Sequence, residues 1–479
     1  MLNARVSDIL DSSPFSPYQA LVAVLCFCAT LLDGFNMTVI GVAAPRIAEY
    51  LRVSPAALGL AMSAGQFGPL IGAALLGMLA DRVGRKRMLV TCTLGFGVFT
   101  LLCAFATGVG QLALFRFIAG LGLGGAIPTA VALGTEYAPG RVRATLATAM
   151  YAGVPVGAAS SGLAAMYLLP TRYGWQSLFV LGGVIPVAIA FVMVLLLPES
   201  LAFLVSRDKG QARVRTILAK IAPDAALGSL ELSATSGRRA GAPVARLFAE
   251  GRATTTILLW MSFFLGYYLI YLMLSWAPVL LRKGGSSVQQ YSMAFALINF
   301  GSAVATVAIG RLMDRTKDPY RILRGGFVLG FASLVAFGLF AGSPFIVIAA
   351  ISVICGFFIN GTVSGLVALV TLSYPEEITG SAVGWAYAVG RSGATLAPFM
   401  GGILIGLNWT VFKICGSNAV GALVIVGLIT MLAAHSAGIR WRTRDGRTEG
   451  GVGLIHRGVA IPSVVTGTLN ERSEASARL

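Results

Sequence analysis

Residues 77–87 read Gly-Met-Leu-Ala-Asp-Arg-Val-Gly-Arg-Lys-Arg and end an apolar stretch in the first half of the chain. Residues 310–315 read Gly-Arg-Leu-Met-Asp-Arg and end another apolar stretch in the second half. Each copy has a glycine, an Asp-Arg pair that begins four residues later, and basic residues after it. The second copy is less complete, with Lys317-Asp318 where Gly-Arg would match the first. This repeat indicates that the chain joins two similar halves.

The composition is that of a membrane protein. The 479 residues are 56% hydrophobic and 11% charged, with a mean hydropathy of +0.82, whereas soluble domains carry about 25% charged residues. Apolar stretches such as 56–80 and 345–372 are long enough for the roughly 20 helical residues that cross a hydrocarbon core. We therefore expect an all-α membrane protein. Residues 1–17 lack a signal-peptide pattern, so the first helix is expected to remain as an anchor.

The apolar stretches predict twelve transmembrane helices in two groups of six. We expect them at 18–42, 56–80, 88–107, 111–135, 145–169, 176–197, 254–280, 290–313, 322–341, 344–372, 382–406 and 411–435. The predicted domains are an N-terminal segment 1–17, a six-helix bundle 18–197, a linker 198–253, a second bundle 254–435 and a basic tail 436–479. The 6+6 division predicts two bundles related by a pseudo-twofold axis, with substrate bound between them near the midplane.

The formal net charge of +17 follows the topology of a membrane protein. With both termini inside, the predicted cytoplasmic segments hold most of the arginines and lysines, and the outer loops hold few. This positive-inside bias explains the excess charge without a nucleic-acid partner, which we exclude. The predicted location is the bacterial cytoplasmic (inner) membrane, with the lipid bilayer as the surroundings and both termini in the cytoplasm.

Three ionisable residues are expected deep in the membrane: Asp33, Arg116 and Arg391. Ionisable groups in lipid are costly and therefore suggest function. Two arginines with one acid leave a surplus of positive charge, which suits an anion whose carboxylate a guanidinium can bind. Two structural alternatives remain open. Asp33 and Arg116 could form a permanent ion pair, and Arg391 could bind backbone carbonyls near Gly390 and Gly393.

The sequence does not indicate a metal, cofactor, nucleotide or enzyme active site. The six cysteines lie in apolar segments without metal-ligand spacing and are interpreted as packing residues, so we predict no metal and no cofactor. No nucleophile and base are paired, and the glycine-rich stretch 120–125 follows no strand, so neither an enzyme nor a nucleotide site is expected. The glycines of the fourth and fifth helices predict close helix packing; they are Gly120, Gly122, Gly124, Gly125, Gly153, Gly157 and Gly162.

The repeated loop sequence resembles the signature between the second and third helices of major facilitator transporters. Residues 32–41, Leu-Asp-Gly-Phe-Asn-Met-Thr-Val-Ile-Gly, resemble the Asp-Gly-X-Asp motif of the aromatic acid:proton symporter family within that superfamily. Similar agreement is found at 116–128, 136–139, 197–200, 276–278, 380–386 and 390–393, and at Trp175 and Pro398. The likeness covers roughly residues 18–435 and implies a major facilitator fold.

The resemblance implies two groups of functional residues. Asp33 would belong to the proton and substrate site and Arg391 would contact the carboxylate. The predicted substrate and proton site comprises Asp33, Phe35, Asn36, Arg116, Tyr271, Trp385 and Arg391. The predicted gating residues are Gly77, Asp81, Arg82, Gly84, Arg85, Arg87, Glu136, Arg143, Asp314 and Arg315. The gating charges would form a cytoplasmic network that stabilises the outward-facing state and breaks when the halves rock.

Two positions depart from the family pattern. Asn36 replaces the second acid of the motif, and an amide does not titrate in the physiological range. Either Asp33 carries the proton alone or coupling is weak or absent, while Asn36 could still hydrogen-bond the substrate. Thr379 replaces an arginine after Pro375, which predicts a thinner charge network in the second half.

These features predict a monomeric transporter that imports aromatic carboxylates together with protons. Another major facilitator substrate, such as muconate or a sugar-like metabolite, remains an alternative. So do export by proton antiport and a membrane receptor that senses the acid without moving it. Helix 5 resembles the glycine-proline motif of antiporters only loosely, at Gly153-Val-Pro155-Val-Gly157.

Overall fold

The computed structural model describes residues 3–205, 211–222, 231–233, 244–316 and 318–444. Within this part of the chain, twelve helices have 19 residues or more. The first six are α2 (Pro17–Leu51), α3 (Pro55–Val83), α4 (Arg85–Cys103), α5 (Val109–Glu136), α6 (Gly140–Leu168) and α7 (Gly174–Leu196). The other six are α11 (Ala253–Lys283), α12 (Val288–Arg315), α13 (Pro319–Leu339), α14 (Phe345–Ser373), α15 (Glu376–Gly406) and α16 (Val411–Arg444).

Eleven of these described helices are long and apolar enough to cross a membrane. The exception is α6, which has the length, but its sequence is dominated by Gly, Ala, Ser and Thr instead of large apolar residues. Small residues lower its hydropathy and let neighbouring helices approach closely. The crossing by α6 thus rests on its packing inside the helical array, against α2 and α12.

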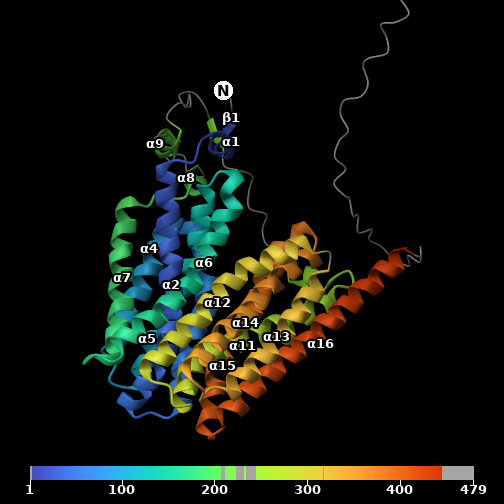
Figure 1. Ribbon diagram of the computed structural model, residues 1–479. Coiled ribbons are helices and arrows are strands. Elements are labelled where there is room, and N and C mark those ends of the chain that lie inside the picture. The colour runs from blue at the N-terminus through green and yellow to red at the C-terminus, as the bar shows by residue number, and fades with distance from the viewer. Residues whose placement is uncertain (1–2, 206–210, 223–230, 234–243, 317, 445–479) are drawn as a thin grey trace, which may run out of the picture. The chain divides into compact units, whose positions relative to one another are not determined.

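Five short elements lie near the beginning of α2: β1 (Asn3–Arg5), α1 (Val6–Ser12), α8 (Leu201–Val205), α9 (Gln211–Ile221) and β2 (Glu231–Ser233). A sixth, α10 (Ala245–Phe248), packs on α11 and α15 of the second half. The strands β1 and β2 pair in parallel, which joins the N-terminal segment to the linker. We call the helix ends near α1, α8 and α9 the linker side and the opposite ends the far side (Figure 1). Residues from Ala434 onward form a second unit, of which the structure describes only the end of α16.

The same packing pattern occurs in both halves of the chain. In the first bundle (α2–α7), α2 packs on α6 and α3 packs on α5; in the second (α11–α16), α11 packs on α15 and α12 packs on α14. Glycines stand at the crossings: a Cβ at Gly157 would overlap the carbonyl of Leu31, and one at Gly356 would overlap that of Ile298. The duplication inferred from the loop motif therefore extends to helix packing, and close packing at these glycines is confirmed.

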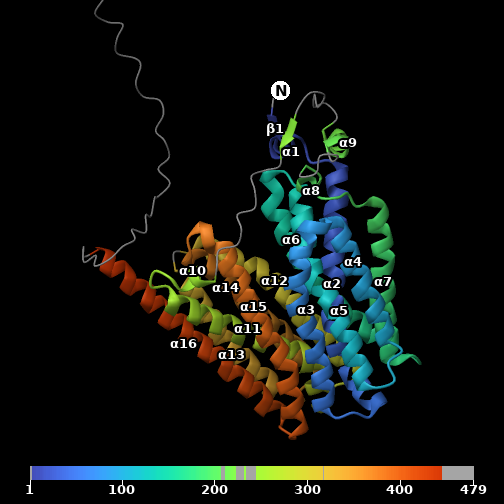
Figure 2. The same ribbon diagram turned by 180° about the vertical axis from the view of Figure 1, so that it is seen from behind.

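The two bundles meet through three helix pairs: α2 with α11, α3 with α15, and α6 with α12. A Cβ at Gly59 would lie 2.6 Å from the carbonyl oxygen of Pro398, and one at Gly162 would lie 2.8 Å from that of Ser292. Across the same end, Arg282 Nη2 binds Glu49 Oε1 at 2.6 Å. All of these contacts lie toward the far side, where both views show the bundles together (Figures 1 and 2).

Four predicted helix ranges need correction. The first helix ends at Leu51 and not near residue 42, because α2 continues through Pro45 and beyond the apolar stretch. The eleventh helix begins at Glu376 and not near 382, with Pro375 at its N-cap. The fifth begins at Gly140 and not near 145, and the twelfth continues to Arg444 and not only to 435. In each case polar residues end the apolar pattern before they end the helix. The C-terminal tail lies outside the described residues from 445 onward.

The close helix crossings predict a strong effect of a single methyl group. We expect Gly157→Ala to destabilise the first bundle by about 1–3 kcal/mol, because its Cβ would overlap the backbone of α2. Gly95→Ala is the matched control, since a Cβ at this helical position meets nothing within 4 Å. Thermal unfolding in detergent checks this, and equal midpoints for both variants would contradict the packing argument.

Candidate functional site

The carboxylate of Asp33 is enclosed in the middle of α2. The residue is 0% exposed, and neither of its side-chain oxygens accepts a hydrogen bond from any residue that the structure describes. The charges of Arg391 and Arg116 both act on this carboxylate. A buried carboxylate without hydrogen bonds is unfavourable unless opposite charges or a proton compensate it. Asp33 is therefore electrostatically coupled to two cations without being bonded to either.

Arg116 comes from α5 and is held in the first bundle. It is 1% exposed, and its Nη2 donates to the backbone oxygen of Asn36 at 2.9 Å. Its Nε and Nη1 have no partner among the described residues. The absence of a side chain at Gly65 leaves room for the guanidinium, because a Cβ there would be 3.3 Å from Nε. Arg116 is thus anchored on the backbone of α2, three residues from Asp33, and does not form a closed ion pair with it.

Arg391 approaches from α15 in the second bundle. The residue is half-buried, and its Nη1 is buried without a hydrogen-bond partner in the described part of the chain. The charges of Arg391 and Asp33 both act on the hydroxyl of Tyr271 on α11. Charges from both bundles therefore act on one another here, among the predicted residues Asp33, Arg116, Arg391 and Tyr271. What binds at these residues stays a prediction.

The other predicted site residues lie elsewhere. Asn36 Nδ2 donates to the backbone oxygens of Leu32 and Gly182, each at 3.0 Å, so its side chain joins α2 to α7. Phe35 packs on the same glycine, where a Cβ would be 2.9 Å from its ring. Trp385 is 42% exposed and stacks on Trp260 with centroids 6.1 Å apart. These placements describe helix packing, and their predicted contact with substrate remains untested.

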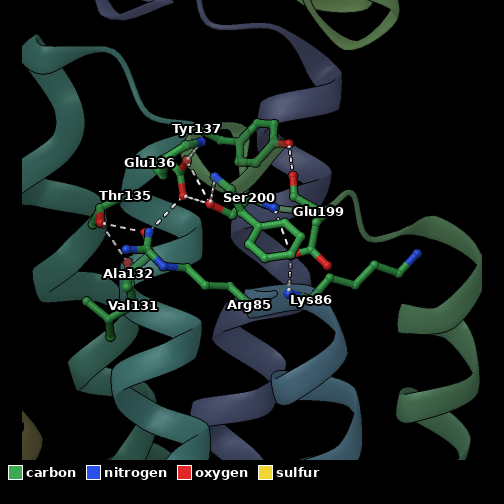
Figure 3. A network of polar contacts seen from close by, with 11 residues as sticks. Arg85, Lys86, Val131, Ala132, Thr135, Glu136, Tyr137, Glu199 and Ser200 are labelled. Carbon is green, nitrogen blue, oxygen red and sulfur yellow. Dashed lines mark hydrogen bonds and ion pairs between the residues drawn. The ribbon is translucent and has the colours of Figure 1, made fainter. Parts of the chain in front are cut away.

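A polar network closes the linker side of the first bundle (Figure 3). Arg85 Nη1 binds Glu136 Oε2 at 2.7 Å, and Ser200 Oγ donates to the same carboxylate at 2.8 Å. The backbone N–H of Ala202 also donates to Glu136. These contacts tie the start of α4 and the end of α5 to the segment after α7.

Glu199 forms the second part of this network (Figure 3). Its Oε1 accepts from the backbone N–H of Lys86 at 2.8 Å, and its backbone oxygen accepts from Tyr137 Oη at 2.6 Å. Gly84 has φ 111°, and a Cβ there would lie 2.5 Å from Glu199 Oε2. Glycine is required at this position both by its backbone conformation and by the carboxylate beside it.

The arrangement of helices and loop charges has counterparts in known proteins. A model of the Major Facilitator Superfamily matches residues 26–398, and a second match covers 259–457. The chain belongs to the major facilitator superfamily. The protein is therefore a transporter embedded in a membrane by several helices, and not an enzyme. The predicted fold class is confirmed, with eleven of the twelve predicted spans meeting the criteria of length and hydropathy.

Relatives within the superfamily cover most of the chain. The 4-hydroxybenzoate transporter PcaK of Pseudomonas putida is 37% identical over 435 residues, which are 90% of this chain and 96% of the relative. The gallate transporter of Pseudomonas putida is 34% identical and covers 84% and 89%. These matches confirm the predicted resemblance to transporters of aromatic acids.

Solved structures of the superfamily share the fold. A bacterial homologue of the human lysosomal transporter Spinster, in an inward-facing and unoccupied conformation, has a TM-score of 0.66 and 19% identity, over 89% of this chain and 97% of that one. The xylose transporter XylE from Escherichia coli, in a partially occluded inward open conformation, has a TM-score of 0.63 and 19% identity, over 85% and 98%.

The gating residues predicted from the superfamily signature are only partly brought together. Gly84, Arg85 and Glu136 share the network, whereas Arg143 Nη2 donates to the backbone oxygen of Ala138 at 3.2 Å. Arg82, Arg87 and Arg315 are exposed, and a Cβ at Gly77 meets nothing within 4 Å. The side chains of Asp81 and Asp314 lie outside the described part. Breakage of the network during transport does not follow from these contacts, since all partners belong to one bundle.

Sequence reasoning assigned no role to two polar contacts of this transporter. The hydroxyl of Ser200 binds Glu136, although residues 197–200 were noted only as part of the family likeness. On the far side, Glu49 binds both Arg46 at 3.2 Å and Arg282 at 2.6 Å. Glu49 lies beyond the predicted end of the first helix, so its pairing could have been anticipated only with the correct helix length.

The network predicts that Glu136 stabilises the first bundle. We expect Glu136→Ala to cost about 2–3 kcal/mol, because Ser200 and the backbone N–H of Ala202 would lose their acceptor, and Arg85 one of its partners, in a mostly buried position. Glu136→Gln, which keeps an acceptor for Ser200, should cost less. Midpoints of thermal unfolding measure the effect against Glu250→Ala, an exposed carboxylate on the linker. An unchanged midpoint for Glu136→Ala would show that the network has no stabilising role.

Proposed function

We propose that the protein imports aromatic carboxylates together with protons by alternating access between the two bundles. The observation that carries this proposal is the buried Asp33, which lacks hydrogen bonds and is influenced by one cation from each bundle. An anion that engages Arg391 changes the charge around Asp33. The names of the relatives, which include 4-hydroxybenzoate, gallate and benzoate transport, support an aromatic acid as that anion.

The orientation proposed is with the linker side in the cytoplasm of a bacterium, at the inner membrane. Basic side chains concentrate at the linker side, which the positive-inside rule favours as cytoplasmic. In the first bundle they are Arg82, Arg85, Lys86, Arg87, Arg141 and Arg143. Because the bundles contact each other at the far side, the conformation described then corresponds to an inward-facing state of a monomeric transporter.

The proposed coupling uses opposing influences on Asp33. Burial favours the neutral carboxyl, whereas a nearby guanidinium favours the charged form. When a substrate carboxylate binds Arg391, that guanidinium is partly neutralised, and protonation of Asp33 becomes more favourable. Substrate and proton would then enter together, and the loaded site would carry less net charge while the bundles rearrange. Asn36 cannot take this role because its amide does not titrate.

Uptake by purified protein in liposomes tests this mechanism. We expect Asp33→Asn to abolish accumulation of 4-hydroxybenzoate driven by a pH gradient while retaining exchange of labelled for unlabelled substrate, since the amide permits binding but carries no proton. Glu250→Gln is the control because its carboxylate is exposed. Gradient-driven accumulation by Asp33→Asn would rule out Asp33 as the proton carrier.

The carboxylate contact predicts a separate effect at Arg391. Arg391→Lys keeps the charge but loses the forked geometry of the guanidinium, so KM should rise about tenfold, with a smaller change in kcat. Initial rates of 4-hydroxybenzoate uptake measure both constants. A KM equal to that of the wild type would place the carboxylate elsewhere.

The far-side ion pair predicts a shift in conformation. Arg282→Gln removes the partner of Glu49 in the other bundle, which should favour separation at the far side by at most about fivefold, as expected for an exposed pair. Labelling of a cysteine placed at Tyr151, which is 50% exposed, by an impermeant thiol reagent from the linker side should slow accordingly. Unchanged labelling would mean that the pair does not bias the bundles.

A further inference from the structure

Four aromatic rings form a compact group in the second bundle. Phe263, Tyr267 and Tyr271 recur every four residues along α11 and stack in sequence, with centroids 6.4 and 6.2 Å apart and interplanar angles of 15°. Tyr387 of α15 meets Phe263 and Tyr267 edge-on, at 5.8 and 6.0 Å. The absence of a side chain at Gly390 of α15 leaves room for the ring of Tyr267, because a Cβ there would lie 2.9 Å from that ring.

The three tyrosines of this group are all influenced by the charge of Arg391. Tyr387 precedes Arg391 by one helical turn on α15, which places both side chains on the same face. The charge of Arg391 acts on the hydroxyls of Tyr267, Tyr271 and Tyr387. The rings of Tyr267 and Tyr387 meet edge-on, with centroids 6.0 Å apart. Two tyrosines in ring contact are thus both within reach of the charge of the proposed carboxylate contact, Arg391.

The group also borders the first bundle. Tyr151 on α6 influences Tyr387 electrostatically, and half of its own surface is exposed. Asp33 influences Tyr271 in the same way. Packing between helices needs only apolar rings, and hydroxyls in lipid require partners. Three hydroxyls gathered at the boundary between the bundles therefore suit recognition of a polar group better than packing alone.

We propose that Tyr267 and Tyr387 bind the ring hydroxyl of a para- or meta-hydroxylated aromatic acid whose carboxylate is held by Arg391. This inference rests on the proposed function and adds the residues that decide substrate preference. One helical turn rises about 5.4 Å, a length on the scale of a benzene ring with one substituent at each end. The ring would lie against Tyr271, where aromatic faces stack favourably.

This arrangement distinguishes the position of the hydroxyl. A para hydroxyl reaches Tyr387, one turn from Arg391, and a meta hydroxyl points toward the same pair. An ortho hydroxyl stays beside the carboxylate, away from both tyrosines. Benzoate leaves the tyrosine hydroxyls without a partner from the substrate, and a site that hydrogen-bonds a hydroxyl discriminates against analogues that lack it.

Competing uptake of 4-hydroxybenzoate and benzoate in liposomes tests the proposal. We expect Tyr387→Phe and Tyr267→Phe each to lower the ratio of kcat/KM for 4-hydroxybenzoate over benzoate about tenfold, the effect of losing one hydrogen bond. The ratio for 2-hydroxybenzoate over benzoate should stay unchanged. Tyr268→Phe is the matched control. This neighbouring tyrosine on α11 is half-buried as well, but the charge of Arg391 does not act on its hydroxyl.

The possible outcomes distinguish the proposed function from the role of the tyrosines. Wild-type protein that transports neither acid would overturn the proposed function itself. Wild-type transport with unchanged ratios in Tyr387→Phe and Tyr267→Phe would overturn only the role of the tyrosines. Equal losses for both substrates, or the same change in Tyr268→Phe, would also overturn it, because these results indicate a structural effect. Thermal unfolding of each variant verifies that the fold is retained.

Discussion

A carboxylate buried in a membrane protein without hydrogen bonds is the constraint on which this structure depends. Asp33 is costly in either charge state unless its surroundings compensate it. One compensating cation, Arg116, is fixed on the backbone of the same bundle, whereas the other, Arg391, belongs to the opposite bundle. The electrostatic balance at Asp33 therefore depends on how the bundles are placed, and in the proposed mechanism this dependence would link protonation to motion.

Contacts within each bundle are close, which suits the rearrangement between bundles in the proposed mechanism. Glycines bring α2 onto α6 and α12 onto α14 at backbone contact, and the network of Arg85, Glu136 and Ser200 ties three segments of the first bundle together. Between the bundles, a partly exposed ion pair and buried glycine contacts at the far side provide the connection. Because the ion pair is exposed to solvent, it adds little to the stability of this contact.

The sequence was sufficient for the superfamily, the two halves and the charged residues of the centre, because apolar stretches and buried charges leave clear patterns. It was insufficient where a helix outlasts its apolar stretch, as α2 does between residue 42 and Leu51, since polarity reports the edge of the lipid and not the end of the helix. The sequence also does not predict which neighbouring helix each side chain faces. Asn36 and Phe35 share a helix with Asp33, but they pack toward α7, and only helix rotation decides which face each residue occupies.

The pairing of β1 with β2 leaves only part of the linker as a free connection between the two bundles. Through β1 and α1, whose Asp11 accepts a hydrogen bond from the backbone of Gly140, strand β2 is secured to the first bundle. The connection to the second bundle therefore effectively begins after Ser233 and reaches α10 at Ala245. A chain extends at most about 3.5 Å per residue. The number of residues between Ser233 and Ala245 thus sets an upper bound on the distance between β2, on the first bundle, and α10, beside the second, in each transport cycle.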